Sequence, residues 1–361
     1  MKIVFTSDLH LDPAKDERLA ALDRILELCR DQSADKLVIS GDLFDSANAA
    51  DILRPFLRDK FSGLGFDVMV IPGNHDYTAY TKDLDFGSDI KVLDKRPYSR
   101  LDYGQISIFA LPYSNQDFSD IAFELGHEKK NEGLNMLLLH CSLDIGSLRE
   151  DEFGDEKRQL YLPVSSKLLG SLGFSHVFAG HFHSSYLEKK ISDDTMFIYC
   201  GSPVSITKKE KGKRKAVVFD SSLAPLEKIT TVDLDTFYYQ DLDIVFSPGE
   251  EIQALNDLKD ILVSYIEEDA MLSINLKGLI AFPEKELAQK VKEIVDKALE
   301  DSSNIESQDI ELSCSYTGIG EVYDDPLFKV FQKRLTEEQI DKDMAEKIKK
   351  IVLKQFSLLK R

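Results

Sequence analysis

Short, uninterrupted runs of apolar residues recur through the first 220 positions. Their length and composition are typical of buried strands, and they lie at residues 3–5, 37–39, 68–71, 136–139 and 177–179. Between several of them apolar residues recur at helical spacing, as in residues 18–30. This alternation predicts a layered α/β domain. Further strand-like segments at 106–111, 196–200 and 216–219 predict a second sheet.

The pattern changes after about residue 223. Strands are predicted at 238–245, 272–276 and 310–313, and they alternate with helices at 252–266 and 284–299, which is typical of a small α+β domain. Two helices follow, at 326–335 and about 340–360, and Thr336 resembles the N-cap of the second one. We therefore predict three parts, residues 1–222, 223–320 and 321–361.

The last predicted helix carries an apolar stripe. Its positions are Ile340, Met344, Ile348, Ile351, Val352, Phe356 and Leu359. Such a stripe packs either on the protein's own core or on a partner, and the periodicity by itself favours the first.

The composition is that of a folded globular protein. Of 361 residues, 43% are hydrophobic and 30% are charged, and the sequence holds no apolar stretch near the roughly 18 residues of a membrane span. The first residues enter a strand-like segment rather than a signal peptide, so we expect a cytoplasmic protein with no membrane partner. The four cysteines are scattered and form no CxxC pair, which predicts buried free thiols instead of disulfides or a cysteine zinc site.

The formal net charge of −19 argues against a polyanionic partner, but the charge is unevenly distributed. Residues 208–215, Lys-Lys-Glu-Lys-Gly-Lys-Arg-Lys, hold six basic side chains and one acid. Taken alone, this run is interpreted as a solvated hairpin turn.

Residues with metal-binding side chains follow each of the five apolar runs. They are Asp8 and His10, Asp42 and Asp45, Asn74, His75 and Asp76, His140, and His181 and His183. Sites in open α/β sheets form outside the carboxyl ends of the strands, so we expect these segments to converge on one crevice. The glycines in the GD, GNH and GH sequences allow tight turns and close backbone approach.

The histidines are concentrated in these positions. Five of the seven follow the apolar runs, and only His127 and His176 lie elsewhere. Any single one could be a hydrogen-bonded structural residue, and Asp45 and Asp76 could cap a turn or orient a neighbour. As a set they predict a metal centre, and their mixture of carboxylate, amide and imidazole groups favours Mn, Fe or Zn over Ca or Mg.

The order of motifs resembles that of the calcineurin-like metallophosphoesterases. DxH, GDxxD, GNHD, a lone histidine after an apolar strand, and GHxH occur in sequence. Within that superfamily, the TSDLH opening, GDLFD and the YCGSP segment at 199–203 resemble the SbcD and Mre-eleven-type family of double-strand-break repair nucleases. The resemblance implies a four-layer αββα sandwich, a small α+β capping domain and C-terminal helices.

The same resemblance implies two divalent metal ions, with manganese as the metal. It assigns one ion to Asp8, His10, Asp42 and His183, and a second to Asp42, Asn74, His140 and His181. It also makes His75 the catalytic histidine near the scissile phosphate, with Asp76 orienting it. Asp45 departs from the archaeal pattern, in which a histidine often stands at this position.

The activity that the resemblance implies is hydrolysis of DNA phosphodiester bonds, as a 3′–5′ double-strand exonuclease and a single-strand endonuclease. The C-terminal helices would bind an SbcC-type (Rad-fifty-type) ATPase, and residues 49–61 and 77–90 would form a homodimer, giving a nucleoid-associated heterotetramer. Phosphate contacts would come from Lys208, Lys209, Lys211, Lys213, Arg214 and Lys215. The alternatives are a phosphoesterase acting on a small phosphodiester and a non-catalytic docking subunit.

Overall fold

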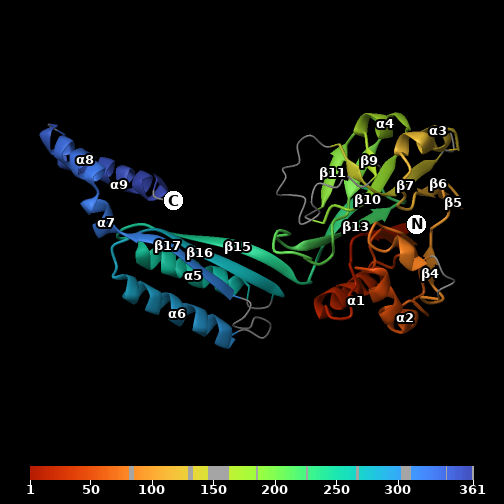
Figure 1. Ribbon diagram of the computed structural model, residues 1–361, viewed down its shortest axis with the longest axis horizontal. Coiled ribbons are helices and arrows are strands. Elements are labelled where there is room, and N and C mark those ends of the chain that lie inside the picture. Colours follow the sequence, from red (N-terminus) through yellow and green to blue (C-terminus); the bar gives the residue numbers. More distant parts are fainter. Residues whose placement is uncertain are drawn as a thin grey trace. The chain divides into compact units, whose positions relative to one another are not determined.

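The chain forms two compact units, Met1–Tyr238 and Tyr239–Arg361. The computed structural model describes residues 1–80, 85–128, 133–144, 162–183, 186–224, 227–265, 268–301, 310–338 and 340–359, with side chains to residue 353. Figure 1 shows the helices and strands of both units.

The first unit contains two six-stranded sheets. The first sheet has the order β14-β13-β1-β2-β3-β4. Its strands are β1 (Lys2–Thr6), β2 (Lys36–Ser40), β3 (Asp67–Ile71), β4 (Ile90–Val92), β13 (Arg214–Asp220) and β14 (Ile229–Leu234). Strands β1 to β4 are parallel, whereas β13 and β14 run antiparallel to their neighbours.

The second sheet has the order β11-β12-β10-β7-β6-β5. Its strands are β5 (Ser99–Tyr103), β6 (Ile106–Ala110), β7 (Leu134–His140), β10 (His176–Gly180), β11 (Leu187–Lys190) and β12 (Met196–Tyr199). Strands β6, β7, β10 and β12 are parallel, and a short pair, β8 (Ser142–Leu143) and β9 (Pro163–Val164), forms a separate two-stranded sheet.

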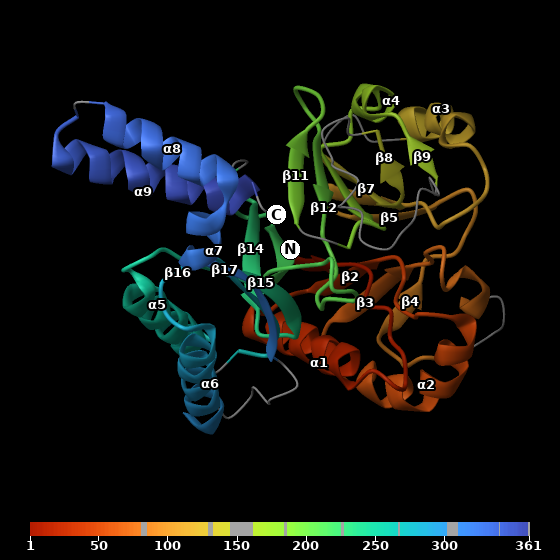
Figure 2. The ribbon, with the colours of Figure 1, turned by 60° about the vertical axis from the view of Figure 1, so that its left-hand side comes forward.

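Helices cover the outer face of each sheet. α1 (Asp16–Asp31) and α2 (Ala47–Lys60) pack in one apolar cluster with the first sheet, and α3 (Phe118–Glu128) and α4 (Ser166–Ser171) pack in another with the second. A third cluster fills the space between the sheets. The sequence prediction of a four-layer αββα sandwich is therefore confirmed (Figure 2).

Strand β1 shows how the sequence builds these layers. Because successive side chains of a strand point to opposite faces, Val4 packs under the helices while Ile3 and Phe5 point between the sheets. The Phe5 ring stacks on Phe178 of β10 with ring centroids 3.6 Å apart. A continuous apolar run is therefore required here, because both faces of the strand are buried.

The second unit is a three-stranded sheet with helices. Its elements are β15 (Tyr238–Phe246), α5 (Glu251–Ser264), β16 (Ala270–Ile280), α6 (Glu284–Asp301), β17 (Ile310–Gly318), α7 (Ile319–Asp324), α8 (Pro326–Glu337) and α9 (Lys342–Leu359). The sheet order is β15-β16-β17, and β16 is parallel to β17. α8 and α9 run side by side, joined through the buried side chains of Phe328 and Leu353 (Figures 1 and 2).

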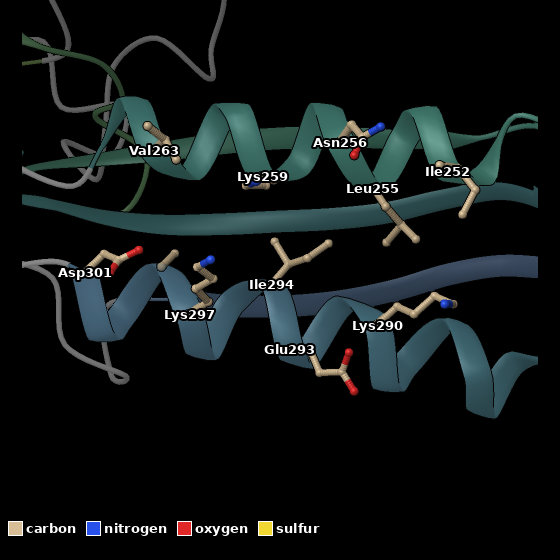
Figure 3. Close-up of a pocket in the computed structure, with 11 residues that line it drawn as sticks. Ile252, Leu255, Asn256, Lys259, Val263, Lys290, Glu293, Ile294, Lys297 and Asp301 are labelled. Atoms are coloured by element: carbon tan, nitrogen blue, oxygen red, sulfur yellow. The ribbon is translucent and has the colours of Figure 1, made fainter.

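Helices α5 and α6 lie along each other and leave a groove of about 370 Å³ between them (Figure 3). Leu255 and Ile294 point into this groove, and Lys259 and Lys297 lie along it. The groove belongs to the second unit, whereas every predicted metal ligand belongs to the first.

The first unit extends beyond the boundary predicted at residue 222. Strand β14 lies after that position but pairs with β13 along its whole length, so the first sheet is complete only at Leu234. The predicted capping domain and C-terminal helices together form the second unit.

The structure differs from the sequence analysis in two local features. Thr336 lies inside α8, where its Oγ1 donates a hydrogen bond to the Gln332 carbonyl at 2.8 Å, so it is not the N-cap of α9. The short helix α7 was not predicted. In the segment 77–90, the described residues form a 3-10 helix at Tyr77–Tyr80 and then β4 from Ile90, while residues 81–84 lie outside the described part of the chain.

The predicted apolar stripe of α9 is divided between a core and the surface. Val352, a stripe position, is partly buried against the cluster that contains Leu279, Val322 and Leu353. Met344 and Ile351 are 53% and 62% exposed. The side chains of the last two predicted stripe positions, 356 and 359, lie outside the described residues. Among described helices, none is both long enough and apolar enough to cross a lipid bilayer.

Candidate metal centre

The predicted ligands lie at the carboxyl ends of five parallel strands. Asp8 and His10 follow β1, Asp42 follows β2, Asn74 and His75 follow β3, His140 ends β7, and His181 and His183 follow β10. These strands belong to both sheets, so the two sheets together supply one site. The structure brings all seven proposed ligands to it.

One group of ligand atoms comes from Asp8, His10 and His183, all of which are buried. The Nε2 atoms of His10 and His183 lie 3.1 Å apart, and His183 Nε2 lies 3.7 Å from Asp8 Oδ1. Imidazole nitrogens this close to each other and to a carboxylate are arranged to share one cation.

A second group comes from Asp8, Asp42 and His140. Nδ1 of His140 lies 3.0 Å from the Ser40 carbonyl, which can only accept, so the proton sits on Nδ1 and the lone pair on Nε2. Nε2 in turn lies 2.8 Å from Asn74 Oδ1 and 3.1 Å from Asp42 Oδ2. Three lone-pair atoms therefore face each other, an arrangement that only a cation or an added proton stabilises.

Asp42 belongs to the second group and also lies close to His10 of the first. Its Oδ2 lies 3.1 Å from His140 Nε2 and 3.8 Å from His10 Nε2, and its Oδ1 accepts a hydrogen bond from the His75 backbone N–H at 2.9 Å. The side chain is completely buried. Its position is therefore that of the bridging carboxylate that the sequence resemblance implies.

His181 is buried at the same strand end. Its backbone N–H donates to both carboxylate oxygens of Asp8, at 3.0 and 3.1 Å, and its ring centroid lies 5.4 Å from that of His140. His181 thus fixes Asp8 through its backbone and also places an imidazole beside the second group.

His75 differs from the other histidines of the site because its side chain is exposed, and its ligand atom forms a third possible group with those of His10 and Asp42. Its ring meets the His10 ring edge-on with centroids 4.7 Å apart. It therefore lies at the solvent side of the cluster, where an imidazole can reach a bound substrate.

The backbone of the site is held in an uncommon conformation. Asp8, His10, Asp42 and His181 have φ values of 54°, 46°, 51° and 93°. The left-handed region is unfavourable for side chains other than glycine, and it persists only where surrounding contacts enforce it. Here the Asp8 and His10 N–H groups donate to the carbonyls of Gly41 and Asp42, each at 3.0 Å.

Glycines allow the segments to approach each other closely. A Cβ atom on Gly41 would lie 2.0 Å from His140 Nδ1, and one on Gly73 would lie 2.1 Å from Asp42 Oδ1. One on Gly180 would lie 2.1 Å from the Ser40 carbonyl oxygen. The GD, GNH and GH glycines are therefore required by the ligand packing.

Two further carboxylates support the site. Asp45 Oδ1 lies 2.9 Å from Arg18 Nη1 and 3.6 Å from His10 Nδ1, and the contact with His10 lowers the pKa of Asp45 to about 2. Asp76 accepts hydrogen bonds from the Gly73 and Phe44 N–H groups, so it ties together the loops that follow β2 and β3. Burial raises the pKa of Asp76 to about 7.

The buried charges are strongly coupled. Burial by itself opposes charge on both His140 and Asp42, but the Asp42 carboxylate raises the pKa of His140 to about 10. The same contact holds the pKa of Asp42 well below its ordinary value. The cluster therefore attracts positive charge, as a metal centre must.

The basic run divides into buried and exposed side chains. Lys208, Lys209, Lys211 and Lys213 are exposed, and Lys215 lies 3.0 Å from Asp233. Arg214, expected to contact DNA, is only 2% exposed and donates to the backbone carbonyls of Ser202 and His183. The structure therefore removes Arg214 from the DNA-contacting set.

Sequence analysis missed one residue of the site. Glu210, the only acid of the basic run, is completely buried, and its Oε1 lies 3.4 Å from His183 Nδ1. Its signal in the sequence was an isolated reversal of charge, which by itself does not distinguish an inward-pointing side chain from an exposed one.

The donor set fits two divalent transition-metal ions. Asp8, His10 and His183 would hold one, and Asn74, His140 and His181 the other, with Asp42 between them. Carboxylate, amide and imidazole ligands without sulfur suit Mn, Fe or Zn.

Comparison with known proteins identifies the family of the chain. The sequence pattern of the calcineurin-like phosphoesterase family matches residues 1–185, slightly more than half of the chain. Similar solved structures include GAP50, the anchor in the inner membrane complex of Plasmodium (13% identity, TM-score 0.42), which covers 64% of this chain and 84% of its own. A dimetal phosphatase from Danio rerio (11% identity, TM-score 0.41) covers 65% of this chain and 96% of its own. The E. coli phosphoesterase YfcE (17% identity, TM-score 0.31) covers 64% of this chain and 98% of its own.

The family match includes all five strand ends that carry the proposed ligands, those of β1, β2, β3, β7 and β10. These are the positions at which the buried carboxylates and histidines meet. The candidate metal site lies within the matched residues, and the chain belongs to the calcineurin-like phosphoesterase family.

Proposed function

We propose that the chain is the nuclease subunit of an SbcD or Mre-eleven-type DNA repair complex, which hydrolyses DNA phosphodiester bonds with two manganese ions. The observation that carries this proposal is the cluster of buried carboxylates and histidines with exposed His75 at its edge. The motifs and the YCGSP segment of the sequence support the assignment to DNA, and so does a second unit that a small substrate does not require.

The chain's own residues suit the reaction as follows. Bound metal ions would supply Lewis-acid stabilisation of the phosphate and a water of lowered pKa. His75, exposed at the edge of the cluster, donates a proton to the leaving 3′ oxygen. The His75 N–H bond to Asp42 Oδ1 fixes its backbone relative to the ligands. The chain itself forms no covalent intermediate.

The exposed lysines of the basic run are the proposed contacts to the DNA backbone. They lie on the segment between Ser202 and Arg214, and Arg214 donates hydrogen bonds to the Ser202 and His183 carbonyls. Phosphate contacts release counterions, so each one changes the slope of log K against log salt by about 0.7 to 0.9. Replacing Lys208, Lys209, Lys211 and Lys213 by alanine should flatten that slope. An unchanged slope would indicate that the run is a solvated turn without phosphate contacts.

The proposal is tested by nucleotide release from linear duplex and single-stranded DNA, with manganese present. The controls are a His75→Asn variant and the generic diester bis-p-nitrophenyl phosphate. DNA cleavage that is lost in the variant supports the nuclease assignment. Turnover of the generic diester without DNA cleavage, with and without the ATPase and ATP, would indicate a small-molecule phosphodiesterase instead.

The proposed ATPase contact is the apolar surface of α8 and α9. Exposed apolar side chains there are Leu327 and Val330 on α8, Met344 and Ile351 on α9, and Ile340 just before α9. Truncation near Glu321 would cut α7 and remove Val322, Phe328 and Leu353, which cover Leu279, so point variants give a cleaner test. Met344→Asp with Ile351→Asp should abolish co-purification with the ATPase and leave metal-dependent cleavage intact; retained binding would exclude this surface.

The proposed homodimer would use α2 and the 3-10 helix at Tyr77–Tyr80. Most apolar residues of α2 are buried in its own core, but Ile52 is 54% exposed and available for contact with a second copy. Ile52→Glu should therefore give a monomer in sedimentation velocity, and an unchanged sedimentation coefficient would rule out this face.

A further inference from the structure

The acid within the basic run points inward, whereas four of the lysines around it are exposed. We propose that Glu210 is a positioning residue for the metal ligand His183, and that Glu210 and Arg214 together fasten the lysine-bearing turn to the metal centre. This inference rests on the proposed metal-dependent function, because it concerns how the metal is held.

The carboxylate of Glu210 is fixed by its own loop. Oε2 accepts a hydrogen bond from the Ile206 N–H at 2.7 Å, and Oε1 accepts one from Thr207 Oγ1 at 3.3 Å. Its backbone is also bound, since its carbonyl accepts from Ser205 Oγ at 2.6 Å and its N–H donates to the Thr207 carbonyl at 3.0 Å. The side chain therefore reaches His183 in one defined orientation.

This orientation determines which nitrogen of His183 faces the metal centre. Nδ1 lies 3.4 Å from Glu210 Oε1, so the Nδ1 proton is directed to the carboxylate and the lone pair stays on Nε2. Nε2 is the atom that lies 3.1 Å from His10 Nε2 and 3.7 Å from Asp8 Oδ1. A carboxylate behind a ligating histidine fixes its tautomer and ring orientation and raises its basicity.

Arg214 holds the backbone of the same histidine. Its guanidinium donates to the His183 carbonyl and, through Nε, to the Ser202 carbonyl at 2.9 Å. The turn is thus attached to His183 twice, by Glu210 at the side chain and by Arg214 at the main chain. Movement of the lysines relative to the metal centre is restricted, so phosphates bound by the turn would keep a fixed register with the reacting bond.

The test is manganese binding by the full chain, measured by isothermal titration calorimetry after removal of metals with EDTA. Glu210→Gln should weaken the binding of one manganese ion by about 10- to 100-fold, the usual effect of losing such a partner. Glu210→Asp, which keeps the charge, should recover part of the affinity. If Glu210→Gln fails to fold, Glu210→Asp carries the test, and its manganese affinity should be lower than that of the wild type.

Glu251 provides the matched control, because it is also a buried carboxylate but lies in the second unit. It accepts hydrogen bonds from the backbone N–H groups of Gly249 at 2.8 Å and Ala281 at 2.6 Å. Glu251→Gln should change the melting temperature and leave manganese affinity unchanged. Wild-type affinity in Glu210→Gln, or an equal loss in Glu251→Gln, would overturn the inference. Failure of the wild-type chain to bind manganese would instead overturn the proposed function and this inference with it.

Discussion

Gly41 offers the most direct test of how the metal centre is packed. It has a φ of 98°, and a Cβ atom there would lie 2.0 Å from Nδ1 and 2.6 Å from Cγ of His140. Ordinary contacts begin at 3.4 Å, so in Gly41→Ala the imidazole must move by about 1.4 Å (3.4 − 2.0). That shift breaks the Nδ1 bond to Ser40 and takes Nε2 away from Asn74 and Asp42.

The expected cost has two parts. An alanine held at positive φ costs about 1 to 3 kcal/mol, and a broken buried hydrogen bond costs about another 1 to 3 kcal/mol. Gly63→Ala isolates the first part, because Gly63 has a φ of 73° and nothing within 4 Å of its Cβ position. The difference between the two variants is therefore the cost of displacing His140.

The assay is urea unfolding of the metal-free chain together with manganese titration. Gly41→Ala should be less stable than Gly63→Ala by about 1 to 3 kcal/mol. Gly41→Ala should also bind one manganese ion at least about tenfold more weakly than Gly63→Ala, because His140 belongs only to the second ligand group. Equal stability and equal affinity of the two variants would refute the argument that close packing against the histidine requires glycine here.

Three further outcomes are expected. His75→Asn should keep the metal content of the wild type and lower turnover by about 10²- to 10⁴-fold, as judged by elemental analysis and diester hydrolysis; metal loss would make His75 a ligand instead. Phe178→Ala should lower the free energy of unfolding in urea by about 3 to 5 kcal/mol, because the ring is stacked between the sheets. Burial lowers the pKa of His176 to about 4, so between pH 6.5 and 4 the unfolded chain binds a proton that the native chain does not. The free energy of unfolding should therefore fall as the pH drops through this window, by at most about 1.4 kcal/mol per pH unit. His176→Asn should flatten that dependence in urea titrations, and an unaltered slope would contradict it.

The layered fold could be predicted because its information is local. A strand buried on both faces requires a continuous apolar run, and the residues that follow such a run lie at one edge of a parallel sheet. Asp8, Asp42 and His140 were therefore placed from the sequence with no knowledge of the contacts between them. The required glycines could be predicted for the same reason.

The remaining features depend on distant contacts. Glu210 and Arg214 lie within a charged run, and only their meeting with His183, from another strand end, explains why they are buried. β14 has a mixed burial pattern because it lies at the edge of its sheet, so its sequence gave no continuous apolar signal, and the first domain was predicted to end too early. Thr336 has the side chain of an N-cap but lies within α8, where its hydroxyl bonds to a carbonyl one turn earlier.

The pairing of β1 with β13 has a consequence for folding kinetics. Lys2 is the partner of Asp220, so this ladder closes a loop of 218 residues (220 − 2), and the central strand of the first sheet has an open edge until β13 has been made. At about 5 to 20 residues per second, synthesis of that loop takes about 11 to 44 s. Contacts of such high sequence separation also slow folding itself. We therefore expect the nascent chain to expose an apolar strand edge for tens of seconds, during which chaperones can bind it.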